Sequence, residues 1–156
     1  MSLPCHKPPT EVDEEKPQVS PGEIREYNGD LYLYSQLVGT AGTVAATEAV
    51  YRADDPDEFK VTKIAASAID NTLGAGNSPE GVAVRSVTTG NYGYFKRTGI
   101  TQVATTGTVN KGDSLCGPDT VSGVMKACSA GLGHLSVGLA LANASGNVVT
   151  AELWIS

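Results

Sequence analysis

Glycine-bearing turns interrupt the C-terminal half of the chain at short, regular intervals, and this pattern constrains the fold more than any other feature. Between residues 81 and 155, short apolar runs alternate with links of two to four residues that contain glycine, asparagine or proline. Links this short form tight turns that need a positive φ or the fixed φ of proline. Short strands at such spacing are typical of an antiparallel all-β domain. The predicted strands lie within residues 81–88, 91–98, 101–106, 113–116, 122–128, 135–142 and 147–155.

Two of these runs resemble each other. GVAVRSV at 81–87 and GLALANA at 138–144 both begin with glycine, an apolar residue, alanine and a second apolar residue. Successive side chains of a strand point to opposite faces, so the small residues share one face. A face of small residues suits a tightly curved sheet whose backbones approach closely. We therefore predict a small antiparallel β-barrel or sandwich.

The first half of the domain also favours strands. Asn28-Gly29 separates EIREY from LYLYSQLV, which is a strong hairpin signal. Residues 43–53 fit a strand or a helix, and their β-branched ends favour a strand. Residues 58–64 alternate again, after an acidic turn at 54–57. The small-residue tract at 65–76 fits either a short helix or an ordered loop. Together these segments predict one β domain over 23–156, with its core at 81–156.

The first 22 residues differ in composition from the rest and are expected to form an extended arm. Five prolines and an acidic cluster at 11–15 leave no apolar face to bury, so we expect the arm to form no core of its own. Two interpretations remain open: a disordered tail, or an arm that docks on a neighbouring subunit, a role that stiff proline-rich segments suit. The candidate contact residues of the arm are Pro4, Pro8, Pro9, Pro17 and Pro21.

The charge balance argues against direct binding to nucleic acid. The net charge is −6, and only 18% of the residues are charged. A protein that binds nucleic acid directly usually has a clustered basic surface, and the closest approach to one here is the pair Lys96-Arg97. The sequence has no run of about 18 apolar residues, which a membrane-spanning helix needs. The N-terminus has no basic region followed by an apolar one, so we expect no signal peptide and synthesis in a cytoplasm.

We expect neither catalysis nor a bound metal or cofactor. The two histidines, His6 and His134, stand apart from any acid–base partner motif. The acidic turn at 54–57 lacks the ligand spacing of a calcium loop. No glycine-rich phosphate loop with a lysine partner is present.

The three cysteines do not form a familiar pattern. An odd number without paired spacing argues against a disulfide framework and against a zinc site. A bridge between Cys116 and Cys128 across a hairpin stays open if the chain meets oxidising conditions.

The aromatic residues are the remaining candidates for contact with a partner. Tyr32 and Tyr34 share one strand face, and Tyr92 and Tyr94 flank Gly93. Exposed tyrosine pairs on a sheet bind sugars, bases or proteins, whereas buried ones pack in a core or girdle. Both interpretations are open for these four. Trp154 is expected either to plug a barrel end or to make a contact between subunits.

A set of short motifs in the C-terminal half resembles one known protein family. The motifs are the GVAV run at 81–84, the turn Lys111-Gly112-Asp113 leading to Leu115, Gly123-Val124, the GLAL run at 138–141, and Gly146, Val148, Ala151 and Leu153. Through them, residues 81–155 are similar to the head decoration, or cement, proteins of tailed bacteriophages, which also tend to begin with a proline-rich arm. The first 80 residues share only that general style.

The resemblance implies a β-barrel or β-tulip-like protomer that assembles as a homotrimer. Its location would be the outer capsid surface of the virion, where it would bind the major capsid protein and clamp adjacent subunits. The family has no catalytic residues, so none are transferred to this chain.

Two other classes of function compete with this one. The first is a carbohydrate-binding or adhesin-like β-module that uses the four tyrosines as its platform. The second is an enzyme on a trimeric β-fold, such as a nucleotide hydrolase. An enzyme of that kind predicts clustered charges in strand-end loops, but Arg85, Arg97 and Lys111 are isolated.

Overall fold

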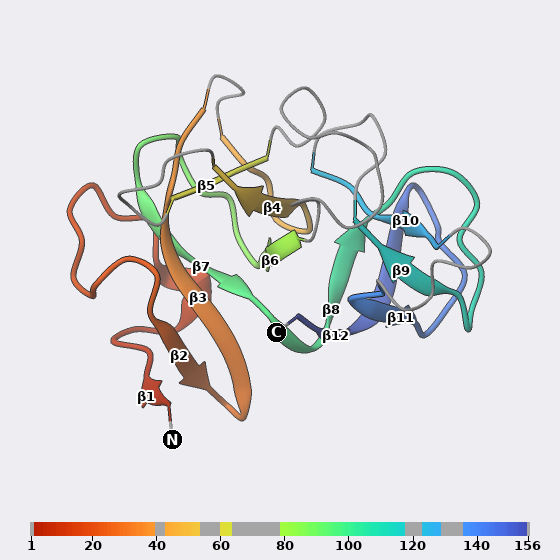
Figure 1. Cartoon of the computed structure of the whole chain (residues 1–156), viewed down its shortest axis with the longest axis horizontal. Helices are drawn as coiled ribbons and strands as arrows, with labels where there is room; N and C mark the ends of the chain where they lie inside the picture. Colours follow the sequence, from red (N-terminus) through yellow and green to blue (C-terminus); the bar gives the residue numbers. More distant parts are fainter. Residues whose placement is uncertain are drawn as a thin grey trace.

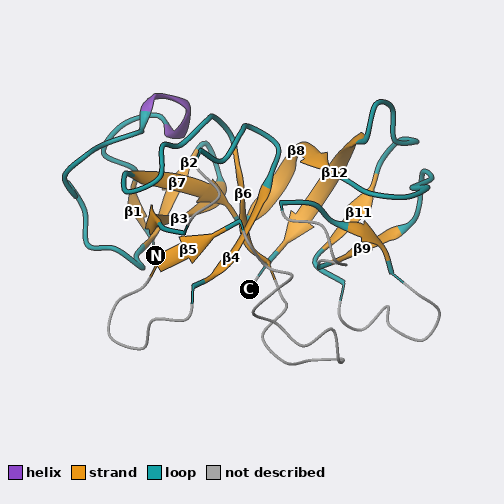
Figure 2. Cartoon of the chain, turned by 90° about the horizontal axis from the view of Figure 1, so that it is seen from above, coloured by secondary structure: helices purple, strands orange, loops and turns teal. Residues whose placement is uncertain are grey.

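The computed structural model describes residues 2–39, 43–53, 60–63, 79–117, 123–128 and 136–155. Within these residues the chain is all-β, as predicted, apart from one turn of 3₁₀ helix at Pro9–Glu11 (Figures 1 and 2). The predicted turn at 54–57, the tract at 65–76 and His134 lie outside the described residues. The strands are β1 (Leu3–Pro4), β2 (Ile24–Tyr27), β3 (Asp30–Leu37), β4 (Ala49–Arg52), β5 (Lys60–Thr62), β6 (Pro79–Ala83), β7 (Tyr92–Lys96), β8 (Thr98–Ala104), β9 (Ser114–Cys116), β10 (Lys126–Ala127), β11 (Gly138–Ala140) and β12 (Val148–Trp154).

Five strands close into a barrel. The first sheet has the order β1-β2-β3-β5-β4-β6-β7, and β7 also pairs with β3, so β3, β5, β4, β6 and β7 form a ring. The pairings β1–β2 and β3–β5 are parallel, which differs from a purely antiparallel sheet. The second of these arises because β5 inserts between β3 and β4. The barrel interior contains Leu33, Leu37, Val44, Val50, Val61, Ala83, Val87 and Phe95.

The second sheet has the order β10-β9-β11-β12-β8 and is antiparallel throughout. It lies beside the barrel in both views (Figures 1 and 2). One face packs on the outer side of β4 and β6, because Ala49, Tyr51 and Val82 share a core cluster with residues of β8, β9, β11 and β12. The Tyr51 hydroxyl also donates a hydrogen bond to the Val124 carbonyl at 2.9 Å. The core predicted over 81–156 is thus divided between two sheets.

The glycines that open the two similar runs lie where backbones approach closely. A Cβ atom at Gly81 would lie 2.7 Å from the Cβ of Phe95 on β7, and one at Gly138 would lie 2.9 Å from the Glu152 carbonyl oxygen on β12. Real Cβ contacts are almost never shorter than 3.0 Å. The close approach predicted from the sequence is therefore confirmed at both positions.

The predicted hairpin at Asn28-Gly29 is also confirmed. These two residues join β2 to β3 with φ values of 51° and 85°. Positive φ at both central residues is the geometry that twists a two-residue turn to match its strands.

Candidate interaction surfaces

The N-terminal segment, residues 2–22, lies against the chain's own barrel. β1 pairs in parallel with β2, and Glu14 bridges to Tyr92 of β7 through two backbone hydrogen bonds. Figure 1 shows the segment in red and orange beside β2, β3 and β7. The docking site of the segment in this structure is the chain's own sheet, and docking on a neighbouring subunit stays a prediction. The predicted contact prolines are distributed unevenly: Pro4, Pro17 and Pro21 are exposed, Pro8 is half-buried and Pro9 is buried.

The sequence predicts no apolar face in this segment, yet two of its valines are buried against the barrel. Val12 is fully buried and Val19 is 9% exposed, and both belong to a cluster with Tyr32, Tyr34 and Tyr94. The two valines stand among polar residues without a strand or helix period, so the pattern does not reveal them. They find burial because the barrel offers them an aromatic surface.

The four predicted tyrosines do come together, but beneath the N-terminal segment. Tyr32, Tyr34 and Tyr94 are buried, and Tyr92 is half-buried. The Tyr34 ring lies 5.0 Å from that of Tyr94 and is stacked at 6.0 Å on that of Tyr92. Burial raises the pKa of Tyr34 to about 12 and also raises that of Tyr94. In this arrangement the tyrosines pack as a core, and the exposed platform that a carbohydrate-binding module needs is covered.

A chain of polar contacts fastens the segment over the tyrosines. The ring of His6 lies between the Tyr94 hydroxyl, 2.8 Å from Nδ1, and Glu14 Oε1, 2.8 Å from Nε2. The Tyr34 hydroxyl donates to the other carboxylate oxygen of Glu14 at 2.9 Å. The isolated histidine of the sequence therefore has a structural role in this network.

Asp13 makes a second attachment. Its carboxylate accepts hydrogen bonds of 3.0 Å from the Thr88 amide, the Thr88 hydroxyl and the Asn91 side chain. Burial by itself would raise the pKa of Asp13, but these hydrogen bonds and the nearby Arg85 guanidinium together lower it. A carboxyl whose folded pKa is depressed stabilises the fold above its unfolded pKa, and it loses that effect as the pH falls through the folded value. Asp13 therefore contributes to holding the segment at neutral pH, and this contribution is lost as the pH falls through its depressed folded pKa.

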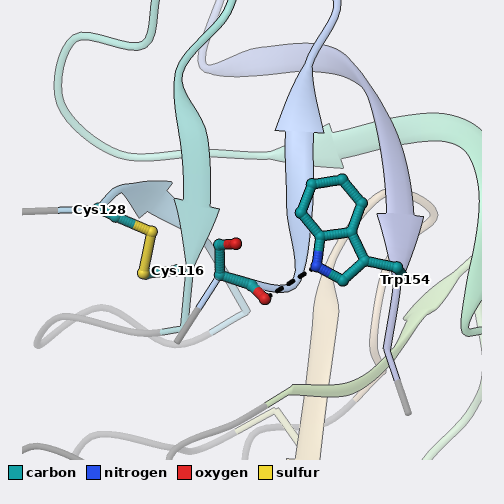
Figure 3. The surroundings of a disulfide bond; sticks show 4 residues. Cys116, Cys128 and Trp154 are labelled. Atoms are coloured by element: carbon teal, nitrogen blue, oxygen red, sulfur yellow. Dashed lines mark hydrogen bonds between the residues drawn. A yellow bond between two sulfur atoms is a disulfide. The ribbon is translucent and has the colours of Figure 1, made fainter. Parts of the chain in front are cut away.

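Trp154 does not plug the barrel. It lies on β12 with 44% of its surface exposed, and its indole N–H donates to the Ser136 carbonyl at 3.0 Å (Figure 3). Of the two expected roles, the contact between subunits is the one that this position leaves open. Ile100 on β8 is 59% exposed and was not predicted as a contact residue, since a lone isoleucine in a strand pattern does not show which face it occupies.

Cys116 and Cys128 form a disulfide, which the sequence left open. The bond joins the end of β9 to the residue after β10 (Figure 3). Cys5 is a free thiol, and burial raises its pKa to about 11. The odd count therefore reflects one bridge and one free cysteine.

The described residues contain no group of three or more His, Cys, Asp or Glu side chains that could hold a metal ion. None of the helical structure described is long and apolar enough to cross a membrane.

Comparison with known proteins supports the fold. No protein-family profile matches the chain, and no curated protein matches it in sequence. Among solved structures, the N base of the head fiber gp8.5 of bacteriophage phi29 is similar, with a TM-score of 0.52 and 19% sequence identity. The match covers 78% of this chain and 92% of the phage chain. At this identity the likeness shows a common fold: the chain has the fold of a phage head-fiber base.

Proposed function

We propose that this chain is a structural protein of a tailed-bacteriophage virion that binds the outside of the head. The observation that carries the proposal is the shared fold with the N base of the phi29 head fiber, which covers nearly the whole of that chain. The sequence resemblance to head decoration proteins points to the same part of the virion by a different route. The resemblance is strongest over residues 81–155, whereas the structural match covers most of the chain.

The proposed role is that of a cement protein. Its partner is the major capsid protein, and it acts as a homotrimer without catalytic activity. A protein that binds only the assembled shell stabilises that shell by mass action. Because many copies bind one shell, a modest free energy of binding at each site adds up over the particle.

The carbohydrate-binding alternative is not favoured. It depends on Tyr32, Tyr34, Tyr92 and Tyr94 as an exposed platform, and the N-terminal segment covers that surface. A sugar would therefore have to displace Val12, the His6–Glu14 contact and the hydrogen bonds of Asp13 before it reached the rings.

The proposal is tested with heads of the phage that encodes the chain, purified from a mutant that lacks it. Purified chain is added and the heads are sedimented. We expect saturable binding, and DNA release from the heads at a higher temperature than without the chain. A heat-unfolded sample of the same chain is the control and should stay in the supernatant. Folded chain that fails to sediment with heads at saturating concentration would contradict the proposal.

A further inference from the structure

The two sheets of this chain repeat one folding unit. Replacing β3, β5, β4, β6 and β7 by β8, β10, β9, β11 and β12 converts the strand order of the barrel into that of the second sheet. The parallel pair Leu37–Val61, which joins β3 to β5 in the barrel, has its counterpart in a parallel bridge between Thr105 and Met125. We call strands β3 to β7 the first repeat and strands β8 to β12 the second repeat.

The turn that precedes β4 recurs before β9. A carboxylate in each turn accepts a hydrogen bond from the amide three residues earlier, at 2.7 Å for Glu48 and 2.8 Å for Asp113. Thr47 has a φ of 80°, and the residue at its position in the second repeat is Gly112, with a φ of 92°. The positive φ of this threonine, which a β-branched residue rarely adopts, is therefore a feature of the repeated turn.

The register of the long strands is also the same in both repeats. Counted back from Leu37 or from Thr105, Tyr34 and Gln102 come three residues earlier, and Tyr32 and Ile100 come five residues earlier. The cross-strand pairs Tyr32–Lys96 and Tyr34–Tyr94 correspond to Ile100–Glu152 and Gln102–Thr150. Ile100 and Gln102 thus occupy on β8 the positions of Tyr32 and Tyr34 on β3.

In the first repeat, the edge of β3 that faces away from β7 is covered by the chain that precedes it. β2 pairs with β3, and Arg25 lies opposite Tyr32. Just before β2, the Tyr34 amide donates to the Glu23 carbonyl at 2.9 Å, and the Gly22 amide donates to the Tyr34 carbonyl at 2.7 Å. The backbone groups of β3 at these two positions therefore have partners.

The same edge of β8 has no covering strand in the described part of the chain. Only one residue separates β7 from β8, so no counterpart of β2 precedes β8. Backbone groups of alternate residues in a strand point to the same side. The amide and the carbonyl of Ala104 bond to residues outside β12, so those of Gln102 and Ile100 point away from β12 as well.

Three of these four backbone groups are open among the described residues. The Ile100 carbonyl accepts a hydrogen bond from the Lys96 ammonium at 2.9 Å, whereas the Ile100 amide and both backbone groups of Gln102 have no partner there. The side chains are uncovered too: Tyr32 and Tyr34 are 6% and 0% exposed, but Ile100 is 59% exposed and Gln102 is exposed. An open strand edge of this kind is a template for pairing with another chain.

We infer that this open edge of β8, residues 100–102, binds an extended strand of the major capsid protein. The added strand takes the place that residues 22–27 have on the first repeat, so it runs antiparallel to β8 and bonds through its backbone. Its residue opposite Ile100 should be apolar or β-branched, because such cross-strand pairs are favourable. Strand addition at a sheet edge is an established mode of peptide recognition. The inference rests on the proposed function and names the site that would hold the shell.

The described strand edges of a second copy complement this edge poorly. β1 and β10 have two residues each, and Pro4 of β1 has no amide to donate. Pairing of β8 with β8 would place two identical edges about a twofold axis, which does not build the proposed homotrimer. The N-terminal segment of a second copy is fastened to its own barrel through Asp13 and Glu14. The shell protein is the partner that remains in the proposed function.

The test compares two substitutions at one position in the full chain. Gln102→Pro removes the outward amide and leaves the pairing of β8 with β12 in place, since proline is tolerated where the amide of an edge strand faces solvent. Gln102→Ala removes the side chain and its 2.7 Å hydrogen bond to the Thr150 hydroxyl but keeps the amide. Thermal melts establish that both variants are folded.

Binding is measured by sedimentation with heads that lack the chain, over a series of chain concentrations. We expect Gln102→Ala to bind as the wild type does. Gln102→Pro should bind about tenfold more weakly, because the capsid strand loses the donor for one of its carbonyls.

Hydrogen exchange on the wild type gives a second measurement that needs no variant. In the free chain the amides of Thr101 and Val103, which point to β12, should exchange slowly, and those of Ile100 and Gln102 rapidly. When the chain is bound to heads, the amides of Ile100 and Gln102 should become protected.

Several results would overturn the inference. They are wild-type affinity of a folded Gln102→Pro, equal loss of binding in both variants, and amides at 100 and 102 that still exchange rapidly on heads. If the wild type self-associates without heads and Gln102→Pro abolishes that association, the edge binds a second copy and the assigned partner is wrong. A wild type that does not bind heads overturns the proposed function and this inference with it, whereas the other results leave the proposed function standing.

Discussion

Replacing Gly81 with valine is expected to destabilise the protein by about 2–4 kcal/mol, because the new side chain has no room in the barrel wall. Its Cβ would lie 2.7 Å from the Cβ of Phe95 and 3.1 Å from the backbone carbon and oxygen of that residue. Neither group is the flexible end of a side chain, so β6 and β7 must separate. Thermal melts should show a melting temperature lower by roughly 5–15 °C.

The control for Gly81 is a glycine with free space around it. Gly146 has a φ of 60°, and a Cβ added there would have no atom within 4 Å. Asparagine tolerates that backbone conformation, so Gly146→Asn should change stability by less than about 0.5 kcal/mol. Equal melting temperatures for Gly81→Val and the wild type would show that β6 and β7 do not approach as described.

Removing the disulfide is the second change with a large expected effect. Cys116 and Cys128 are separated by 12 positions, and a closed loop of that length lowers the entropy of the unfolded chain enough to contribute about 3 kcal/mol. The double variant Cys116→Ser, Cys128→Ser should lose that amount in denaturant unfolding. The lost constraint lies at the β9–β10 end of the second sheet, so the barrel is expected to keep its strands.

Reduction provides the internal control for this prediction. A reducing agent should destabilise the wild type as much as the double substitution does, and it should leave the double variant unchanged. Cys5→Ser removes the free thiol and should keep the effect of reduction intact. A thiol assay that finds three reactive cysteines in the unfolded, unreduced wild type would contradict the bond itself.

The sequence predicts the strands well because their signals are local. Each of the seven runs predicted after residue 80 overlaps a strand, and the favoured strand within 43–53 is β4. The links at Asn28-Gly29 and at Gly146-Asn147 show the positive φ values that their residue types predict. Local propensity and tight turns are sufficient to locate these elements.

How the strands group into two sheets could not be predicted, because that depends on contacts distant in sequence. β7 closes the barrel by pairing with β3, some sixty positions earlier. The run at 31–38 holds one clue, because it is apolar on both faces. In the structure, Leu33 and Leu37 point into the barrel. Tyr32 and Tyr34, on the other face, contact the N-terminal segment. That pattern indicates a strand covered on both sides but does not say by what.

The candidate surfaces were predicted less well than the fold, for the same reason. Trp154 was singled out by its residue type and lies on an exposed face, whereas the exposed Ile100 becomes evident only once β8 and β12 are paired. The tyrosines were correctly grouped, but their cover came from Val12 and Val19, in a segment whose composition suggested none. Exposure is a property of the folded chain that residue type does not determine.

The location of the chain in the virion is the most direct test of the account. Cryo-electron microscopy would compare virions made with and without this protein. We expect difference density of the size of this chain on the outer surface of the head, repeated at equivalent positions of the shell. Difference density confined to the tail or the interior, or none on either, would contradict it.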